Sequence, residues 1–262
     1  MPSKDLERAL VQGLRELRMP GIRNSFPEMA ALARQESLSF ERFLLALVEQ
    51  EQQSRTNHRN QRFLRASDLP REKTLDQFDR TRLPAPINHQ LSTLLEGGFL
   101  DRSENVLALG PPGTGKTHLL CALGNELVHQ GRRVRFYHCR ALVDALMQAK
   151  RDQCLSQLMK QLLRFEALIV DGLGYAKHSP EEVDVLFQLL AERYERGSVL
   201  VSSHLAFSDW EQIFQNAMTT TAVVDRLVHH SVILELNLPS YRLEVAHQRQ
   251  NAEQSSAKAE DE

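Results

Sequence analysis

The feature that most constrains the fold is an eight-residue loop at 110–117 with the sequence Gly-Pro-Pro-Gly-Thr-Gly-Lys-Thr. It fits the pattern GxxxxGK[ST], and it lies between a strand-like apolar run at Asn105–Leu109 and a helical pattern that starts near Lys116. Glycines allow a tight turn whose backbone amides point inward, and the following helix adds the positive end of its dipole. A chance glycine-rich turn is the alternative, but strand, loop and helix agree. The sequence therefore predicts a phosphate-binding loop.

This loop predicts both a nucleotide and a metal ion. Lys116 should reach the β- and γ-phosphates, and the hydroxyl of Thr117 should ligate Mg²⁺. We therefore expect ATP and Mg²⁺ as the cofactors. The residues predicted to bind the nucleotide are Gly110, Pro111, Pro112, Gly113, Thr114, Gly115, Lys116, Thr117 and His118.

A second acidic position lies further along the chain, where Phe165–Asp171 forms an apolar run that ends in an acid. In a parallel sheet the carboxyl ends of the strands form the ligand-binding edge. Asp171 would there hold Mg²⁺ through water. The alternative is a buried strand that ends in an ordinary surface aspartate.

The second half of the chain alternates between strand-like and helical patterns. Alternation of this kind predicts crossover units and a mainly parallel sheet that is covered on both faces. Apolar strand-like runs lie at 106–109, 134–137, 168–170, 199–201 and 232–236, and helical patterns lie at 116–130, 140–163, 181–196 and 219–230. The expected fold is an α/β ATPase domain with a five-stranded parallel sheet.

The first 65 residues instead have the apolar spacing of helices, as at Leu6, Leu10, Leu14 and Leu17. We predict a small all-helical N-terminal domain at 1–66 that binds DNA or a partner, a linker at 67–85, the ATPase domain at 86–250 and a disordered tail at 251–262. The linker prediction rests on two prolines and mixed charge, and the tail prediction on small polar residues.

Composition excludes several classes of protein. No stretch approaches the roughly 20 apolar residues of a membrane helix, and the N-terminus lacks the apolar core of a signal peptide. We therefore expect a cytoplasmic protein. The 3 cysteines show no CxxC spacing, which favours reduced thiols over a disulfide or zinc site. The net charge of −2 gives the whole chain no nucleic-acid signature, so local charge must be considered.

Two groups of basic residues are candidates for DNA contact. The first is a stripe on one predicted helix face, made of Arg55, Arg59, Arg62 and Arg65. Such a stripe can neutralise phosphates without reading sequence, which makes binding salt-sensitive. The second group is Lys150, Arg151 and Lys160. A solvated helix face is the alternative for the arginine stripe.

Several segments together resemble one family. The segments at 110–124, 168–175, 189–198, 221–231 and 239–242, with Leu17–Ile22 and Leu38–Glu41, are similar in the same order to the IstB family of transposition helper ATPases. This AAA+ family is related to the DnaC-type helicase loaders. The resemblance extends from about residue 10 to residue 250.

The resemblance implies an ATP-dependent homo-oligomer with the nucleotide between neighbouring subunits. It also implies that the protein binds duplex DNA and recruits and activates a cognate transposase. By position, Arg226 matches the arginine finger and Arg242 matches the sensor arginine. A guanidinium at the γ-phosphate stabilises charge that develops in phosphoryl transfer. A structural salt bridge is the alternative for each arginine.

Two positions depart from the pattern of related ATPases, and both concern hydrolysis. Asp171 is followed by Gly172 where a second acid usually orients the attacking water, and the sensor position at the end of the fourth strand is His204. An imidazole can still bind a phosphate or a water molecule, with a different pH dependence. We predict tight ATP binding with slow hydrolysis. Glu181 and Glu182 are acids that could substitute.

Two other functions remain open. A DnaC-like loader would share the ATPase core but act on single-stranded DNA and a replicative helicase. A scaffold would bind ATP without hydrolysing it, an option that Gly172 and His204 leave open. A loader would prefer single strands, and a scaffold would release no phosphate with or without DNA.

Overall fold

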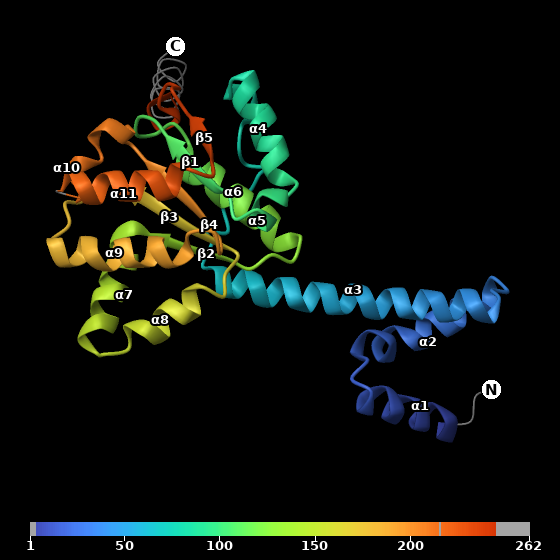
Figure 1. Ribbon diagram of the computed structural model, residues 1–262. Coiled ribbons are helices and arrows are strands. Elements are labelled where there is room, and N and C mark those ends of the chain that lie inside the picture. The colour runs from blue at the N-terminus through green and yellow to red at the C-terminus, as the bar shows by residue number, and fades with distance from the viewer. Residues whose placement is uncertain (1–3, 215, 245–262) are drawn as a thin grey trace, which may run out of the picture. The chain divides into compact units, whose positions relative to one another are not determined.

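The computed structural model describes residues 4–214 and 216–244, so the predicted tail at 251–262 and the last residues of the predicted ATPase domain lie outside it. Five strands form one sheet in the order β2-β3-β4-β1-β5, and every pair of neighbours is parallel (Figure 1). The strands are β1 (Asn105–Leu109), β2 (Val134–His138), β3 (Ala167–Leu173), β4 (Ser198–Ser203) and β5 (Ser231–Glu235). The predicted α/β fold with a five-stranded parallel sheet is therefore confirmed.

Helices cover both faces of this sheet. Residues that alternate along β1 enter different cores: Leu107 and Leu109 pack on one face, and Val106 and Ala108 pack on the other. The first core also contains residues of α7 (Cys139–Arg151), α8 (Leu155–Leu162), α9 (Pro180–Arg193), α10 (Glu211–Phe214) and α11 (Ala217–Val228). The second contains residues of α4 (Ala85–Leu95), α5 (Gly98–Asp101) and α6 (Lys116–His129). The result is three layers, with the sheet in the middle (Figure 1).

The helical pattern predicted at 140–163 forms two helices, because α7 ends at Arg151 and α8 begins at Leu155. Gln153 has a left-handed backbone with φ 57°. Its amide donates to the carbonyl of Lys150, and the amide of Cys154 donates to that of Ala149. This is the hydrogen-bond pattern of a Schellman cap, which closes a helix and turns the chain.

By contact clustering the chain divides into two compact units, residues 1–62 and 63–262. The N-terminal helices are α1 (Lys4–Glu16), α2 (Pro20–Gln35) and α3 (Phe40–Ser67). The predicted boundaries at 66 and 85 differ from this division, since the core unit already begins at Phe63. Within the described residues, no helix is long and apolar enough to cross a membrane.

The segment between α3 and α4, which we predicted as a linker, is packed against the core unit. Leu69 and Leu83 are buried in the same cluster as α6. The segment also contains a short 3-10 turn at Arg80–Arg82. A second such turn, at Phe207–Asp209, precedes α10. The first of these segments places side chains beside the phosphate-binding loop, as described next.

Candidate nucleotide site

The predicted phosphate-binding loop joins the carboxyl end of β1 to the first turn of α6. Gly110, Gly113 and Gly115 have φ values of 139°, 84° and 97°, a region that side chains disfavour. A Cβ atom on Gly110 would lie 2.4 Å from the carbonyl oxygen of Leu236. The glycines are therefore required both by the turn and by the close approach of the chain after β5.

Lys116 lies inside this loop. Its Nζ donates to the carbonyl oxygens of Gly110 at 2.6 Å and Pro111 at 2.7 Å, and the residue is buried. Burial lowers the pKa of Lys116; the charge of Asp171 acts against this, and the charge of Arg242 adds to it. The ammonium is thus held at the place where the loop amides would receive phosphate oxygens.

The acid predicted to help bind magnesium is at the centre of a small hydrogen-bond network. Thr117 and Ser202 each donate a hydroxyl hydrogen bond of 2.6 Å to Oδ1 of Asp171. The amide of Gly172 donates to the Ser202 hydroxyl at 2.8 Å, and Nδ1 of His138 lies 3.3 Å from Oδ2 of Asp171. Mg²⁺ in nucleotide sites is held by one or two protein ligands together with phosphates and water. The pair of Thr117 and Asp171 fits that ion.

Sequence reasoning missed Ser202 and His138. His138 is the last residue of β2 and pairs in register with Asp171, while Ser202 is near the end of β4. Both strands are neighbours of β3 in the sheet. The strand order was the missing information, because it decides which strand ends meet at the acid. Within the described residues, no group of three or more His, Cys, Asp and Glu side chains could hold a metal ion.

A cavity of about 210 Å³ lies beside the loop. Lys116, Thr117 and Arg242 line it, together with Lys73 and Tyr175. The backbone of the Arg242 segment is tied to the loop, since the amide of Tyr241 donates to the carbonyl of Gly113 at 3.0 Å. The structure therefore brings Arg242 to the phosphate-binding loop of its own chain.

An adjoining hollow shares Gly115, His118 and Tyr241 with this cavity and is lined by apolar side chains. Phe78 contributes an aromatic ring that meets His118 edge-on, with 5.3 Å between the ring centres. Leu83 and Leu238 line the same hollow. Gln77, Asp79 and Arg82 also line it, and the hollow measures only about 50 Å³.

Arg226 has a different position. Its Nη1 donates to the carbonyl of Ala222, and its guanidinium lies over the ring of Phe187 at 4.9 Å. Its own carbonyl accepts from the side chain of Asn105, the first residue of β1. The phosphate loop follows the other end of β1, so at about 3.3 Å per residue roughly 15 Å of strand separates them. Arg226 is not part of the site of its own chain.

The two departures from the usual hydrolytic residues have structural explanations. Gly172 has φ 83°, and a Cβ atom there would lie 3.0 Å from the ring of Tyr175. Tyr175 in turn stacks on His204, with ring centres 4.4 Å apart. Tyr175 lines the cavity, but His204 is not among the residues that do so. Nδ1 of His204 is buried without a hydrogen-bond partner in the described part of the chain.

Neither proposed substitute for the missing acid lines the cavity. Glu182 has structural partners: it caps α9 through the amide of Ser179 and pairs with Arg140 at 3.1 Å. These partners keep the pKa of Glu182 low, the Ser179 amide most strongly. Glu181 is exposed in the first turn of α9. None of the residues that line the cavity is an aspartate or glutamate.

The basic candidates for DNA contact do not all have the same surroundings. Arg55 is engaged within its own unit, because its Nε lies 2.7 Å from Glu51 and its Nη2 donates to the carbonyl of Arg18. Arg151 also has a partner, since its Nη2 donates to Gln148 at 2.7 Å. All members of both groups are exposed, Arg55 included: Arg55, Arg59, Arg62, Arg65, Lys150, Arg151 and Lys160.

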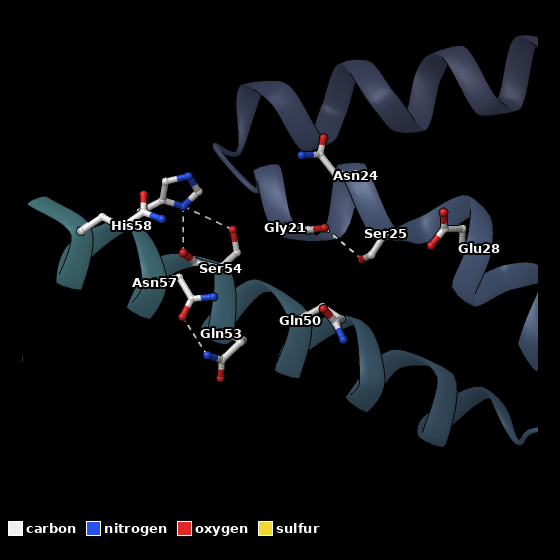
Figure 2. A pocket seen from close by; sticks show the side chains of 10 residues that line it. Gly21, Asn24, Ser25, Glu28, Gln50, Gln53, Ser54, Asn57 and His58 are labelled. Atoms are coloured by element: carbon white, nitrogen blue, oxygen red, sulfur yellow. Dashed lines mark hydrogen bonds between the residues drawn. The ribbon is translucent and has the colours of Figure 1, made fainter. Parts of the chain in front are cut away.

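A larger hollow of about 460 Å³ lies between α2 and α3 of the N-terminal unit (Figure 2). Amide and hydroxyl side chains dominate it, and some bond to each other, as when Gln53 donates to Asn57 at 2.9 Å. No lysine or arginine is among its lining residues. It therefore lacks the cations that a nucleotide needs, and the smaller cavity at 110–117 is the candidate site.

Comparisons with known proteins give a consistent result. A family model described as IstB-like ATP binding protein matches residues 12–250. An insertion sequence ATP-binding protein of Sinorhizobium fredii is 38% identical over 230 residues, which cover 87% of this chain and 77% of that protein. The insertion sequence IS21 ATP-binding protein of Pseudomonas aeruginosa is 37% identical over 230 residues, with 88% and 87% covered.

Solved structures show the same fold at lower identity. DnaI matches with a TM-score of 0.54 and 19% identity, over 64% of this chain and 95% of that one. AMPPCP-bound DnaA from Aquifex aeolicus matches with a TM-score of 0.54 and 17% identity, over 71% and 56%. These likenesses support the AAA+ fold alone. The family match and the two insertion-sequence relatives show more: this chain belongs to the IstB-like ATP-binding proteins of insertion sequences.

Proposed function

We propose that this protein is an ATP-dependent, duplex-DNA-binding oligomer that assists a transposase in the cytoplasm by binding target DNA and recruiting and activating the enzyme. In this proposal Lys116 and the loop amides bind the phosphates of ATP, and Thr117 and Asp171 hold Mg²⁺. When bound, Mg²⁺ would neutralise charge on the β- and γ-phosphates.

The observation that carries the proposal is the separation of the two arginines. Arg242 lines the cavity of its own chain, whereas Arg226 lies at the opposite end of β1. The guanidinium of Arg226 can therefore reach only the nucleotide of a neighbouring subunit. An ATP site that needs a neighbour makes assembly depend on ATP, as expected of a helper that forms a particle on DNA.

Hydrolysis should be slow. Gly172 provides no carboxylate, and no aspartate or glutamate lines the cavity in the described part of the chain. Ser202 and Thr117 both hold Asp171, which leaves that acid suited to a metal ion rather than to activating water. We expect steady-state turnover below the ~1–100 s⁻¹ of efficient phosphoryl-transfer enzymes, and a rate within that range would contradict this part of the proposal.

The test is sedimentation velocity of the protein with labelled duplex DNA, with and without ATP·Mg²⁺. We expect a large particle that requires both, and we expect Arg226→Ala to abolish it while ATP binding by the free subunit is kept. Arg164→Ala, an exposed arginine in the turn before β3, is the matched control. A small species indifferent to ATP would overturn the proposal. Assembly on single strands alone would favour the helicase-loader function.

The DNA surface can be tested separately. We propose that Arg59, Arg62 and Arg65 contact phosphates, and that Lys150, Arg151 and Lys160 form a second contact. Neutralising one phosphate-binding arginine should flatten the slope of log K against log salt by about 0.9. Arg59→Ala should show this change, whereas Arg42→Ala, an exposed arginine in the first turn of α3, should not. Equal slopes for Arg59→Ala and Arg42→Ala would show that the arginine stripe does not contact DNA phosphates.

A further inference from the structure

The segment between α3 and α4 is fixed along α6 at its middle. The side chain of Asn125 donates to the carbonyl of Lys73 at 3.0 Å, and Nε2 of His118 lies 2.9 Å from the carbonyl oxygen of Thr74. Upstream, Leu69 packs over Gly124, where a Cβ atom would lie 3.1 Å from the leucine side chain. The backbone at 69–74 therefore has a defined place beside the helix that follows the phosphate loop.

This anchoring carries Lys73 to the phosphate end of the helix. Thr117, Cys121 and Asn125 follow each other at intervals of four residues, so they share one face of α6. The Lys73 carbonyl meets Asn125, and Lys73 is also among the residues that line the cavity at Lys116 and Thr117. Lys73 therefore lies beside α6 with access to the phosphate end of that helix.

Lys73 has no acidic partner there. Some half-buried cations of the core unit are paired with carboxylates, as Arg132 is with Asp101 and Glu166, and others have different partners, as Arg226 has the carbonyl of Ala222 and the ring of Phe187. Lys73 is half-buried too, yet among the described residues no carboxylate forms an ion pair with it. An ammonium at this place with no carboxylate paired to it can donate charge-assisted hydrogen bonds to a phosphate.

The cavity has more positive than negative charge around it. Lys73, Lys116 and Arg242 all line it, and Asp171, which is bonded to the lining residues Thr117 and Ser202, compensates only part of their charge. Three cations around one small cavity repel each other, and the repulsion is relieved by a polyanion that contacts all of them. The triphosphate of ATP has the required charge and length.

We propose that Lys73 is a third phosphate-binding cation of the nucleotide site, supplied by the segment that precedes the ATPase core. This inference rests on the proposed function, since it takes the ligand of the cavity to be ATP. Lys73 contacts the triphosphate from the side of α6. Arg242 contacts it from the segment that follows β5, so the two cations come from opposite ends of the core sequence. ATP binding consequently fixes the segment that directly follows α3.

The experiment measures dissociation constants for ATP·Mg²⁺, ADP·Mg²⁺ and AMP by titration calorimetry. Loss of one charge-assisted phosphate contact should weaken ATP binding by roughly 10-fold or more in Lys73→Met. AMP, which has the fewest phosphates, should be affected least. Lys73→Arg should restore much of the affinity, because it keeps the charge. The backbone contact with Asn125 survives in both variants, so the fold is not at risk.

Arg71→Met is the matched control, since Arg71 is an exposed cation of the same segment that does not line the cavity. Wild-type ATP affinity in Lys73→Met, with affinity lost in Lys116→Met, would overturn the inference and leave the proposed function intact. Failure of the wild-type protein to bind ATP would overturn both. As a second readout, backbone amides at 71–80 should gain protection from hydrogen exchange with ATP in the wild type but not in Lys73→Met.

Discussion

The two units of this chain are built from similar apolar spacings but differ in how much they bury. The core unit buries strands and helices in two clusters, one on each face of its sheet. Of the described residues in the N-terminal unit, only Leu14, Gly21, Leu47 and Glu51 are buried. Several of its large apolar side chains are mostly exposed: Leu6, Leu17, Phe40, Leu44 and Leu45.

The difference shows that an apolar pattern predicts a helix without predicting how fully its face is covered. Small units bury a smaller fraction of their surface and need other contacts. In the N-terminal unit such contacts are made by the carboxylate of Glu51. It accepts hydrogen bonds from the amide of Ile22 at 3.1 Å and from Nε of Arg55 at 2.7 Å. The core unit has its own buried polar group, Arg193, but that residue is surrounded by packed apolar side chains.

The largest effect should come from Arg193, which is 1% exposed at the end of α9. Its guanidinium donates to the carbonyls of Leu162, Phe165, Glu166 and Ser198, which lie at the end of α8 and the starts of β3 and β4. Arg193→Ala leaves these carbonyls unpaired and opens a cavity, so it should lower the free energy of unfolding by about 3–5 kcal/mol.

Thermal and urea unfolding of the full chain measure this change. Arg196→Ala removes an exposed arginine from the turn that follows and should leave stability within about 0.5 kcal/mol. If both variants unfold like the wild type, the buried arginine does not hold the core unit together.

The contrast between the units also explains what could be predicted from the sequence. The strand predictions agree with the structure to within a few residues, because buried parallel strands are continuous apolar runs such as Leu168–Val170. The predictions for Lys116 and Thr117 follow from the spacing of the loop motif, and the prediction for Asp171 follows from an apolar run that ends in an acid. Local patterns determine both.

What could not be predicted depends on contacts between distant segments. Ser202 and His138 meet Asp171 only because β2 and β4 are the neighbours of β3. Lys73 lies in a segment whose prolines and charges are typical of a linker, and only its packing on α6 brings it to the cavity. Arg55 has the spacing of a DNA-binding stripe, but its partner Glu51 is one helical turn away and buried.

The next effect concerns the N-terminal unit. Glu51→Gln removes the charge that accepts from Ile22 and Arg55, and it should lower the stability of that unit by about 1–3 kcal/mol. The matched control is Glu49→Gln, an exposed residue on the same helix. Hydrogen exchange at residues 4–62 reports this unit separately from the core. Equal protection of the backbone amides in Glu51→Gln and Glu49→Gln would show that Glu51 does not stabilise the N-terminal unit.

This contact also predicts a pH dependence. Burial raises the pKa of Glu51, but hydrogen bonds from Arg55 and from the amides of Ile22 and Gly21 outweigh it, so the net pKa is lowered. A carboxyl whose folded pKa is depressed stabilises the fold above its unfolded pKa, and that stability is lost as pH falls through the folded pKa. The unit should therefore loosen in acid in the wild type, and Glu51→Gln should flatten the dependence.

A smaller effect is expected at Gly172 in the core unit. A side chain there must adopt φ 83° against the ring of Tyr175, at a cost of about 1–2 kcal/mol. Gly172→Glu would introduce the acid that related ATPases carry, but the left-handed backbone should prevent the usual geometry. We expect lower stability and no gain in phosphate release. Faster release would show that the missing carboxylate alone limits hydrolysis.

The smallest effect tests the exposed apolar face of the N-terminal unit. Phe40 is 89% exposed, so Phe40→Ser removes almost no buried area and should change the unfolding free energy by no more than about 0.5 kcal/mol. Leu47→Ala on the same helix, at 8% exposure, should cost about 2–5 kcal/mol by the usual range for buried leucine. If Phe40→Ser instead destabilises the isolated subunit as much as Leu47→Ala does, the phenylalanine is covered in solution, and the contrast in burial between the two units is smaller than the structure indicates.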